Sequence, residues 1–502
     1  MRADWFDARD HDKKWEIRKR DKSLREELAK ALIENEWDAA EAQAIANWDI
    51  YDQNGRADWF DSGWMFGERK RVFDIVIGNP PYIQLQKNRG ELANKYRDEG
   101  YGTFARTGDV YVLFCERGMA LTRPERGVLS YVTSNSWLRA KYGQGLRRQL
   151  SDSHTPLRLI ELGKDVFENA IVDSSVLIAR SGSGAGPFPA LDVDRLKIDT
   201  VALDDLADEE WNEVRPGGDA PWSILSRPEW RVMEKMKERG TPLKDWDGIA
   251  IYRGILTGYN KAFLVDDSQR SRLIAEDSKS AEILKPILRG RDIQRYRADW
   301  AGLWLVSTLP SLAIDIDDYP AVKHHLLSYG RDRLEQSGRQ LPDGRRARKK
   351  TPHRWFELQD TCAYHAEFAA PKLLWIELAD RGRFAYDDTG TLAEATAFML
   401  TGAPAKYLCG ILNSQLVQWF LQHSAPTSGM GALRWKKAYL LHLPIPDADL
   451  DRRQRLISLV DRVLRAKGAD SLVDTSDIET EIDQQVFRLF GLNAVEVGAI
   501  TP

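Results

Sequence analysis

The first sixty residues alternate hydrophobic and polar positions with the period of an α-helix. Leucines recur every four residues from Leu24 to Leu32, directly after Ser23 and Glu26, whose spacing is that of a capping box. Asp38 gives a second start signal, ahead of an alanine-rich stretch that ends near residue 48. The pattern therefore predicts two helices in this part of the chain, one beginning near residue 23 and one near residue 38.

From residue 73 to about residue 180 the pattern changes to alternating strands and helices. Residues 73–78 (FDIVIG) form a continuous apolar run, which is typical of a strand buried on both faces. Helical patterns follow over residues 109–121 and 142–150, and strand patterns over residues 127–133, 157–162 and 174–180. The last two strands are close enough in sequence to pair as a hairpin. This region predicts half of an open, mostly parallel α/β sheet.

The rest of the chain lacks this alternation. Residues 181–189 (SGSGAGPFP) are typical of a linker, because the glycines lead into prolines rather than into a helix. Residues 243–446 mix short strand-like runs with turns rich in tryptophan and arginine, and helical spacing returns after residue 446. The chain thus divides into an α/β part, an irregular part and a helical end.

Composition narrows the classes of protein that remain. The chain has 502 residues, and 72 lysines and arginines against 76 acidic residues leave a net charge of −4, which excludes a basic-tail nucleic-acid binder and an acidic disordered chain. The balance conceals a basic segment, residues 331–354, with nine basic and three acidic residues. Three cysteines cannot build a disulfide framework, and no run of 18 apolar residues occurs, so we expect a cytoplasmic protein without membrane spans.

The sequence Asn79-Pro80-Pro81-Tyr82 directly follows the first predicted strand. Ligands of open α/β sheets bind just beyond the carboxyl ends of strands, so we expect these side chains in a cleft. The prolines fix the backbone and remove N–H donors, the asparagine amide offers an acceptor, and the tyrosine offers a flat aromatic face. Two acceptors and a stacking ring suit a planar substrate with an exocyclic amino group, whose nitrogen becomes positive as it attacks an electrophile.

This motif and its surroundings resemble the adenine-specific DNA methyltransferases, and within them the type IIG restriction–modification methylases. The resemblance extends from about residue 37 to the C-terminus. Its first part rests on NWDIYDQNGRADWFDSGWMFG, FDIVIGNPPYIQ, GDVYVLFCERGMAL, SNSWLRAKYG and VFENAIVDSSVLIA. Its second part rests on IYRGILTGYNKAF, ILRGRDIQRY, WFELQDT, GILNSQLVQWF and LRWKKAYLLHLPIP, which resemble that family's target-recognition domain.

The resemblance implies methyl transfer from S-adenosylmethionine to the N6 amino group of an adenine flipped out of duplex DNA. It implies that Asn79 and the Pro80 carbonyl hold the amino group, that Tyr82 stacks on the base, and that Phe167 packs against the other face of the base. The positions that match the cofactor-binding region are Asp58, Trp59 and Phe60. No metal is expected for methyl transfer, and the C-x-x-H spacing at residues 362–365 lacks a second pair of ligands.

One departure from the family concerns the cofactor. The family binds S-adenosylmethionine with a glycine-rich loop after its first strand, whereas the 78 residues before Asn79 contain no such loop and look like the family's helical insertion. The nuclease of type IIG proteins is also absent, since neither LPDGR nor IPDAD continues into Glu-x-Lys. We therefore expect the C-terminal portion of a larger protein, or one member of a split pair whose separate or upstream-encoded partner carries the cofactor-binding loop.

These observations predict a fold class and an order of domains. The expected fold class is α/β: a partial S-adenosylmethionine-dependent methyltransferase sheet of Rossmann type with a helical insertion, then a mixed α+β target-recognition domain and C-terminal helices. The expected boundaries are residues 1–55 for the helical insertion, 56–185 for the catalytic-loop half of the methyltransferase domain, 186–242 for a connector, 243–446 for the target-recognition domain and 447–502 for the C-terminal helices.

Basic residues of the C-terminal half are the candidates for contacts with double-stranded DNA. They are Arg253, Arg289, Arg291, Arg345, Arg346, Arg348, Lys349, Lys350 and Arg434. Their spacing does not separate phosphate contacts from base contacts. Besides an adenine methyltransferase of restriction–modification or phage defence, two alternatives stay open: a DNA-recognition subunit without catalysis, and a methyltransferase that acts on RNA bases or protein glutamine. The long region that resembles a DNA target-recognition domain argues against the latter.

Overall fold

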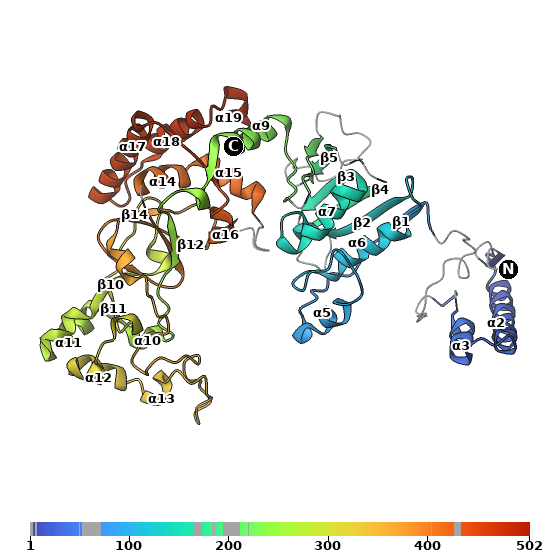
Figure 1. The fold of residues 1–502 in the computed structure, drawn as a ribbon, viewed down its shortest axis with the longest axis horizontal. Helices are drawn as coiled ribbons and strands as arrows, with labels where there is room; N and C mark the ends of the chain where they lie inside the picture. Colours follow the sequence, from blue (N-terminus) through green and yellow to red (C-terminus); the bar gives the residue numbers. More distant parts are fainter. Residues whose placement is uncertain are drawn as a thin grey trace.

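The computed structural model describes residues 4–5, 8–49, 51–52, 72–163, 173–182, 184, 186–193, 211–218, 220–402, 404–425 and 433–501. Figure 1 shows a pair of N-terminal helices, a central lobe built on a β-sheet and a larger C-terminal lobe of mixed strands and helices. No helix in these ranges is long and apolar enough to cross a membrane. Cys115, Cys362 and Cys409 are buried free thiols.

Both helices predicted near the N-terminus form, as α2 (His11–Glu34) and α3 (Ala39–Asn47). Helix α3 begins where the sequence predicts, because the Asp38 carboxylate accepts hydrogen bonds from the first backbone N–H groups of the helix. Helix α2 begins at His11, with Asp10 as its N-cap, so Ser23 and Glu26 lie inside the helix and the predicted start near residue 23 is wrong.

The face of α2 that packs on α3 is polar rather than leucine-rich. Arg25 is buried, forms an ion pair with Asp21 at 2.8 Å, and donates to the carbonyls of Ala46 and Trp48 at 2.7 and 2.6 Å. Leu24, by contrast, is exposed. The guanidinium therefore caps the C-terminal end of α3, where the last backbone carbonyls have no hydrogen-bond partner within the helix.

A six-stranded sheet forms the centre of the second lobe. Its strands are β1 (Ile75–Gly78), β2 (Val128–Ser134), β3 (His154–Gly163), β4 (Ser174–Ser181), β5 (Phe188–Asp192) and β6 (Asn212–Val214), in the order β1-β2-β4-β3-β5-β6. The β1–β2 and β3–β5 pairs are parallel and the other neighbours are antiparallel. The four predicted strands and the β3–β4 hairpin are confirmed, but the sheet that the structure describes is mixed rather than mostly parallel.

Helices α6 (Val110–Leu121) and α7 (Gln144–Ser153) occupy the predicted positions and pack on this sheet (Figure 1). The short helix α5 (Glu91–Tyr96) lies between β1 and α6 in the chain. The core beneath α6 and α7 contains Tyr111, Leu129, Trp137, Leu159 and Leu177, all buried. This packing places the carboxyl ends of the parallel strands β1 and β2 at one edge of the sheet.

Strand β1 is the outer strand and is exposed on one face. Val76 packs against the core, whereas Ile75 and Ile77 on the other face are 69% and 79% exposed. Val132 of β2 and Val176 of β4, which pair with each other, are only half-buried. The prediction that the FDIVIG run is buried on both faces is therefore wrong for the residues that the structure describes.

The region expected to be a connector, residues 186–242, contributes to both lobes. Strand β5 pairs with β3, and β6 pairs with β5, so the sheet continues past the boundary expected at residue 185. Helix α9 (Arg227–Arg239) then belongs to the C-terminal lobe, where it packs against β18 and α19. The apparent linker at residues 181–189 is thus the short connection from β4 to β5.

The C-terminal lobe contains two four-stranded sheets and two ribbons of two strands. The sheets have the orders β15-β10-β11-β9 and β14-β12-β16-β8, and the ribbons are β13–β17 and β7–β18. The strands are β7 (Gly240–Pro242), β8 (Ala250–Arg253), β9 (Leu264–Asp266), β10 (Leu284–Leu288), β11 (Leu303–Val306), β12 (Lys372–Ile376), β13 (Leu378–Ala379), β14 (Ala385–Asp387), β15 (Leu392–Ala393), β16 (Ala397–Thr401), β17 (Leu433–Arg434) and β18 (Pro444–Pro446).

Helices of this lobe lie at its two ends (Figure 1). Besides α9, they are α10 (Asn260–Phe263), α11 (Asp267–Glu276), α12 (Pro320–Leu327), α13 (Arg331–Leu334), α14 (Ala405–Leu412), α15 (Gln415–Ser424), α16 (Lys437–Leu440), α17 (Leu450–Ala469), α18 (Ser476–Leu489) and α19 (Ala494–Ile500). The helical structure predicted after residue 446 is confirmed by α17, α18 and α19.

One hydrophobic core spans the expected boundary at residue 446. Leu373 of β12 and Leu408 of α14 belong to the same buried cluster as Leu456 and Val463 of α17 and Ile482 of α18. A second buried cluster lies around the sheet of β9, β10 and β11. The C-terminal helices are therefore packed into the irregular lobe and do not have a core of their own.

Candidate functional site

The Asn79-Pro80-Pro81-Tyr82 segment leaves the sheet at the end of β1 and is fixed to the start of α6. The N–H of Val110 donates to the Ile83 carbonyl, and the N–H of Leu85 donates to the Gly108 carbonyl, both at 2.9 Å. These two bonds hold the segment at both the beginning of α6 and the residues before it. The structure thus confirms a strand that leads into a constrained turn, as the proline pair predicts.

Asn79 and Tyr82 lie side by side in this turn. The Tyr82 hydroxyl donates to the side-chain oxygen of Asn79 at 3.1 Å. Asn79 is exposed, Pro80 is buried and Tyr82 is partly buried. Among the residues that the structure describes, none donates a hydrogen bond to the Pro80 carbonyl. One carbonyl and the remaining lone pair of the amide oxygen are therefore available as acceptors at the end of β1.

A cluster of buried phenols supports Tyr82 from within the protein. Its ring meets the Tyr111 ring edge-on, with 6.0 Å between centroids, and the hydroxyls of Tyr111 and Tyr142 are 2.8 Å apart. Burial raises the pKa of all three tyrosines, and a hydrogen bond with Ser174 opposes this rise at Tyr82. The phenols are neutral at ordinary pH, so this cluster positions the Tyr82 ring and supplies no base.

A second polar group lies at the end of β2 and was not predicted. The Asn135 side chain donates to Oε1 of Glu161 on β3 at 2.6 Å, and Arg139 lies 3.7 Å from the other carboxylate oxygen. Burial raises the pKa of Glu161, and the charge of Arg139 opposes that rise. The signal in the sequence was a glutamate inside the apolar LRLIELG strand, together with the SNSW turn that follows β2.

The other residues expected around the base and the cofactor cannot be placed against this geometry. Phe167, expected on the second face of the base, lies outside the described residues, as do Asp58, Trp59 and Phe60, expected at the cofactor. No group of histidine, cysteine, aspartate and glutamate side chains that could hold a metal ion occurs in the described ranges. The described part of the site therefore consists of the turn after β1, the tyrosine cluster and the Asn135–Glu161 pair.

The arginines near β8 and β10 that are candidates for DNA contacts differ in whether their side chains already have partners within the protein. Arg253 is exposed and donates to the Ala395 carbonyl at 2.9 Å. Arg289 forms an ion pair with Asp292 at 2.8 Å, and the hydrogen bond to that carboxylate raises the Arg289 pKa. Arg291 is exposed, with no ion pair among the described residues. Arg434 lies in β17, and its side chain is outside the description.

The basic run of residues 345–350 separates into exposed and buried side chains. Arg346, Lys349 and Lys350 are exposed, and Arg345 is exposed but paired with Asp343. Arg348 is 2% exposed. Its guanidinium donates to the carbonyls of Leu334, Thr257, Glu357 and Trp355 at 2.7, 3.0, 2.8 and 2.6 Å.

Arg348 therefore does not face DNA, and the expectation that it does is wrong. Burial lowers its pKa to about 10, which leaves the guanidinium charged at neutral pH. A buried guanidinium is stable only when its donors are satisfied, and four carbonyls satisfy them here. Its role is to fix the surrounding segments.

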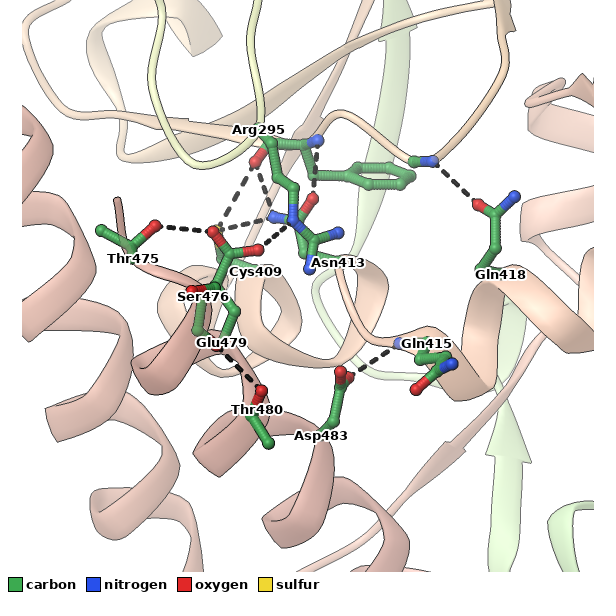
Figure 2. A network of polar contacts seen from close by, with 12 residues as sticks. Arg295, Cys409, Asn413, Gln415, Gln418, Thr475, Ser476, Glu479, Thr480 and Asp483 are labelled. Carbon is green, nitrogen blue, oxygen red and sulfur yellow. Dashed lines mark hydrogen bonds and ion pairs between the residues drawn. The ribbon is translucent and has the colours of Figure 1, made fainter. Parts of the chain in front are cut away.

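Figure 2 shows Arg295, which follows Arg289 and Arg291 in the chain, beside Glu479 of the C-terminal helix α18. Arg295 forms an ion pair with Glu479 of α18. One turn further along α18, the Asp483 carboxylate accepts a hydrogen bond from the backbone N–H of Gln415 at the start of α15, at 2.8 Å. Burial raises the pKa of Asp483 to about 6. The Arg295–Glu479 ion pair joins the segment that follows Arg289 and Arg291 to α18, and the Asp483–Gln415 hydrogen bond joins α18 to α15.

Two protein families match this chain, each over one of the lobes. Residues 7–167, which include the turn after β1, match the Eco57I restriction-modification methylase family. Residues 285–445, which include Arg289, Arg291 and the basic run, match the TaqI-like C-terminal specificity domain. The methylase match includes strands β1, β2 and β3 and the turn after β1, and the second match covers the middle part of the C-terminal lobe, from β10 to β18.

Individual proteins resemble the chain over most of its length. Type II methyltransferase M.BstVI of Geobacillus stearothermophilus is 25% identical over 429 residues, which are 80% of this chain and 72% of the relative. Type II methyltransferase M.PaeR7I of Pseudomonas aeruginosa is 23% identical over 461 residues, 88% of this chain and 75% of the relative. Both relatives span the sheet and the C-terminal lobe together.

A solved structure shares the fold. The type IIL restriction–modification enzyme MmeI, solved in complex with DNA, superposes with a TM-score of 0.53 at 12% identity, over 85% of this chain and 56% of the MmeI chain. The α/β sheet, its turn after β1 and the attached specificity lobe define a DNA methyltransferase of a type II restriction–modification system. The two family matches and the type II methyltransferase relatives support a restriction–modification methylase of type IIG with a recognition domain in the C-terminal lobe.

Proposed function

We propose that the chain transfers a methyl group to the N6 amino group of adenine in duplex DNA, at a specific sequence, in restriction–modification or phage defence. The observation that carries this proposal is the turn after β1. There the Asn79 side-chain oxygen and the Pro80 carbonyl offer two acceptors beside the Tyr82 ring. An exocyclic amino group has two hydrogens to donate and a flat ring on which an aromatic side chain stacks.

Each side chain of the turn has a defined task in this reaction. Asn79 and the Pro80 carbonyl accept hydrogen bonds from the amino group and stabilise the positive charge that develops on its nitrogen. Tyr82 stacks on the flipped base, and its hydroxyl holds the Asn79 amide in place. S-adenosylmethionine would supply the electrophilic methyl group. Asp58, Trp59 and Phe60, expected to contact it, lie outside the described residues, so no contact with the cofactor is described.

The sheet itself supports a further partner segment. Ile75 and Ile77 are exposed on the outer strand β1, and Val132 and Val176 on the same face are half-buried. Parallel strands are ordinarily covered on both faces, and the unpaired edge of an outer strand can pair with a further strand. We propose that a strand outside the described residues, in this or a separate chain, pairs with β1 and brings the cofactor-binding loop to the turn.

A second function is compatible with the same features. A chain that binds DNA without the cofactor would act as the recognition subunit of a split restriction–modification system, and the exposed edge of β1 would then be where a catalytic partner joins. This alternative predicts binding to duplex DNA without binding to S-adenosylmethionine. The three buried free thiols fit a reducing compartment, so we propose the cytoplasm as the site of either function.

Methylation of duplex DNA by the purified chain tests the proposal, with and without the polypeptide encoded directly upstream. We expect N6-methyladenine, identified by mass spectrometry of the digested DNA, and we expect Asn79→Ala to abolish it while duplex binding persists. Asn94→Ala, at an exposed asparagine of α5, is the matched control and should leave methylation unchanged. N6-methyladenine formed at the normal rate by Asn79→Ala, or methylation of another base, would contradict the proposal.

A further inference from the structure

Residues 338–348 form an antiparallel hairpin in the C-terminal lobe. The N–H of Ala347 donates to the Arg339 carbonyl at 2.9 Å, and the N–H of Leu341 donates to the Arg345 carbonyl at 2.7 Å. Figure 1 shows this segment (gold, after α13) at the end of the lobe away from α17 and α18. Ala347 and Arg348 at the base of the hairpin are buried, whereas residues 338–340 and 342–346 are exposed.

The base of this hairpin is rigidly held. Arg348, the last hairpin residue, is buried and is fixed by the four carbonyls described above. Just outside the hairpin, the Thr351 hydroxyl donates to the side-chain oxygen of Gln336 at 2.6 Å, and the Thr351 N–H donates to the Gln336 carbonyl at 3.1 Å. The two strands of the hairpin therefore leave the lobe at a fixed place.

Several cations of the hairpin and its base make no ion pair within the described structure. Arg339, Arg346, Lys349 and Lys350 are exposed and have no ion pair among the described residues. Of the other arginines of the basic segment, three have carboxylate partners: Arg331 with Glu335, Arg345 with Asp343, and Arg354 with Glu357. Arg348 donates to backbone carbonyls, and the guanidinium of Arg333 lies over the Tyr259 ring. A group of unpaired cations on a rigid support is the arrangement that neutralises phosphates.

These cations lie on both faces of the hairpin. Gln340 pairs directly opposite Arg346, so their side chains share one face. Arg339 is the neighbour of Gln340, and its side chain alternates to the other face. An element with cations on one face suits a single row of phosphates, whereas cations on two faces suit the two rows that border a groove. The major groove of B-DNA is wide enough for a two-stranded ribbon.

We propose that the hairpin of residues 338–348, with Lys349 and Lys350 at its base, enters a groove of duplex DNA and contacts the phosphates on either side. It sets position and contributes affinity without reading bases. Arg348 is a positioning residue, which aims the hairpin and touches no DNA. This inference rests on the proposed function in so far as both require duplex DNA as the substrate.

The salt dependence of DNA binding tests the inference, because each phosphate contact contributes about 0.9 to the slope of log K against log salt. The full chain is titrated with a duplex of the methylated sequence and with a scrambled duplex, at several salt concentrations. For Arg339→Ala/Arg346→Ala/Lys349→Ala/Lys350→Ala we expect the slope to fall by about 3 on both duplexes. The matched control removes four exposed cations of α17, Arg452, Arg455, Arg462 and Arg465, and should change the slope by less than about 1.

Arg348→Met tests the positioning role with every exposed cation retained. We expect the slope to fall by about 2, and amide exchange at Ala347 to accelerate, because the base of the hairpin is no longer held. A merely structural role would lower thermal stability and leave the slope unchanged in the folded protein. Should Arg348→Met fail to fold, the exposed quadruple substitution decides the inference alone, since its side chains make no ion pairs in the described structure.

Each outcome separates the hairpin from the proposed function. An unchanged slope in the quadruple variant would overturn the inference, as would a loss confined to the specific duplex, which would indicate base reading. A reduced slope on both duplexes with no methyl transfer by the wild-type protein would support the hairpin and contradict the methyltransferase proposal. Failure of the wild-type chain to bind duplex DNA at any salt concentration would overturn both.

Discussion

The Tyr82 hydroxyl donates a hydrogen bond to the side-chain oxygen of Asn79 at 3.1 Å. In the proposed reaction, the ring that stacks on the base therefore also holds the amide that binds the amino group. The two residues act as one unit, so a change at either should affect both stacking and amine binding. This coupling distinguishes the motif from two independent contacts that happen to be near in sequence.

Substitutions at Tyr82 separate its ring from its hydroxyl. Tyr82→Phe loses one neutral hydrogen bond, for which about 0.5 to 1.5 kcal/mol is typical, so kcat/KM should fall by at most about tenfold. Tyr82→Ala also loses base stacking of about 1 to 3 kcal/mol, so its kcat/KM should be lower by roughly a further ten- to hundredfold. Steady-state methylation assays at matched DNA occupancy give both numbers. Equal losses in the two variants would contradict the stacking role.

Asp483 should make stability depend on pH. Its pKa rises from 3.8 to about 6 on burial, so the folded state binds this proton more tightly than the unfolded state does. The resulting stabilisation is fully present below about pH 4 and is lost as the pH rises through about 6. Between pH 4 and pH 7 the free energy of unfolding of the wild type should fall by on the order of 1 to 3 kcal/mol relative to that of Asp483→Asn. Urea unfolding of both proteins across this range measures the difference.

A nearby carboxylate provides a control of opposite sign. Backbone hydrogen bonding from Ser476, at 2.9 Å, lowers the pKa of exposed Asp474. Its stabilisation is present above its usual pKa and is lost as the pH falls through the lowered value. Asp474→Asn should therefore give no loss of relative wild-type stability between pH 4 and pH 7. A pH dependence for Asp474→Asn like that for Asp483→Asn would show that burial of Asp483 is not the cause.

The buried ion pair of Lys372 and Asp387 should be costly to break. The two residues are opposite each other in strands β12 and β14, and the ammonium group of Lys372 also donates to the Phe368 carbonyl at 2.7 Å. Asp387→Ala leaves a buried charge without its partner and should cost about 3 to 5 kcal/mol of unfolding free energy. The double substitution Lys372→Met/Asp387→Leu should cost less, and denaturant unfolding would show the order. A larger loss in the double variant would contradict this account.

The three thiols should be unreactive in the native protein. Burial raises the pKa of Cys115, Cys362 and Cys409 to about 12, so almost no thiolate is present at neutral pH. Incubation with a maleimide should leave the folded protein unmodified by mass spectrometry, whereas the urea-unfolded protein should take up three labels. Rapid labelling of the folded protein would mean that the C-terminal or central core opens readily.

Ile77 tests the proposed pairing at β1. Its side chain is 79% exposed, so Ile77→Glu should change the stability of the chain alone by no more than about 0.5 kcal/mol. The same change should weaken association with a polypeptide that supplies the adjoining strand, and methylation with it. Leu472→Glu, at a side chain 91% exposed in the C-terminal lobe, is the control. Unaltered association in Ile77→Glu would contradict pairing at this face.

The sequence predicted correctly those helices, strands and turns whose determining interactions join residues close together in the chain. Helix α6 and strand β2 form where the spacing of apolar residues predicts them, and the strand–turn that carries Asn79 and Tyr82 is encoded in consecutive residues. Helix α3 begins at its predicted cap because Asp38 acts within its own turn. In these cases the sequence holds both partners of the interaction within a few positions.

Contacts between distant segments could not be predicted in this way. Asn135 follows β2 and Glu161 lies near the end of β3. Their contact depends on the strand order of the sheet, in which β4, although later in the chain, lies between β2 and β3. Arg348 is buried because carbonyls from residues 257, 334, 355 and 357 converge on it, and a run of basic residues gives no sign of that convergence. The leucine spacing of α2 likewise concealed that Arg25 makes its contact with α3.

The hydrophobic core shared by β12, α14, α17 and α18 sets the size of the unit that can be grafted between relatives. Leu456 and Val463 lie in the same buried cluster as Leu373 and Leu408, so a cut at residue 446 would expose apolar surface on both halves. A cassette running from Leu225, just before α9, to α19 keeps that core whole, because Leu225 belongs to the same cluster and α9 and α19 pack against each other. Reassortment of target specificity would therefore succeed at junctions before residue 225 and fail at junctions inside the lobe.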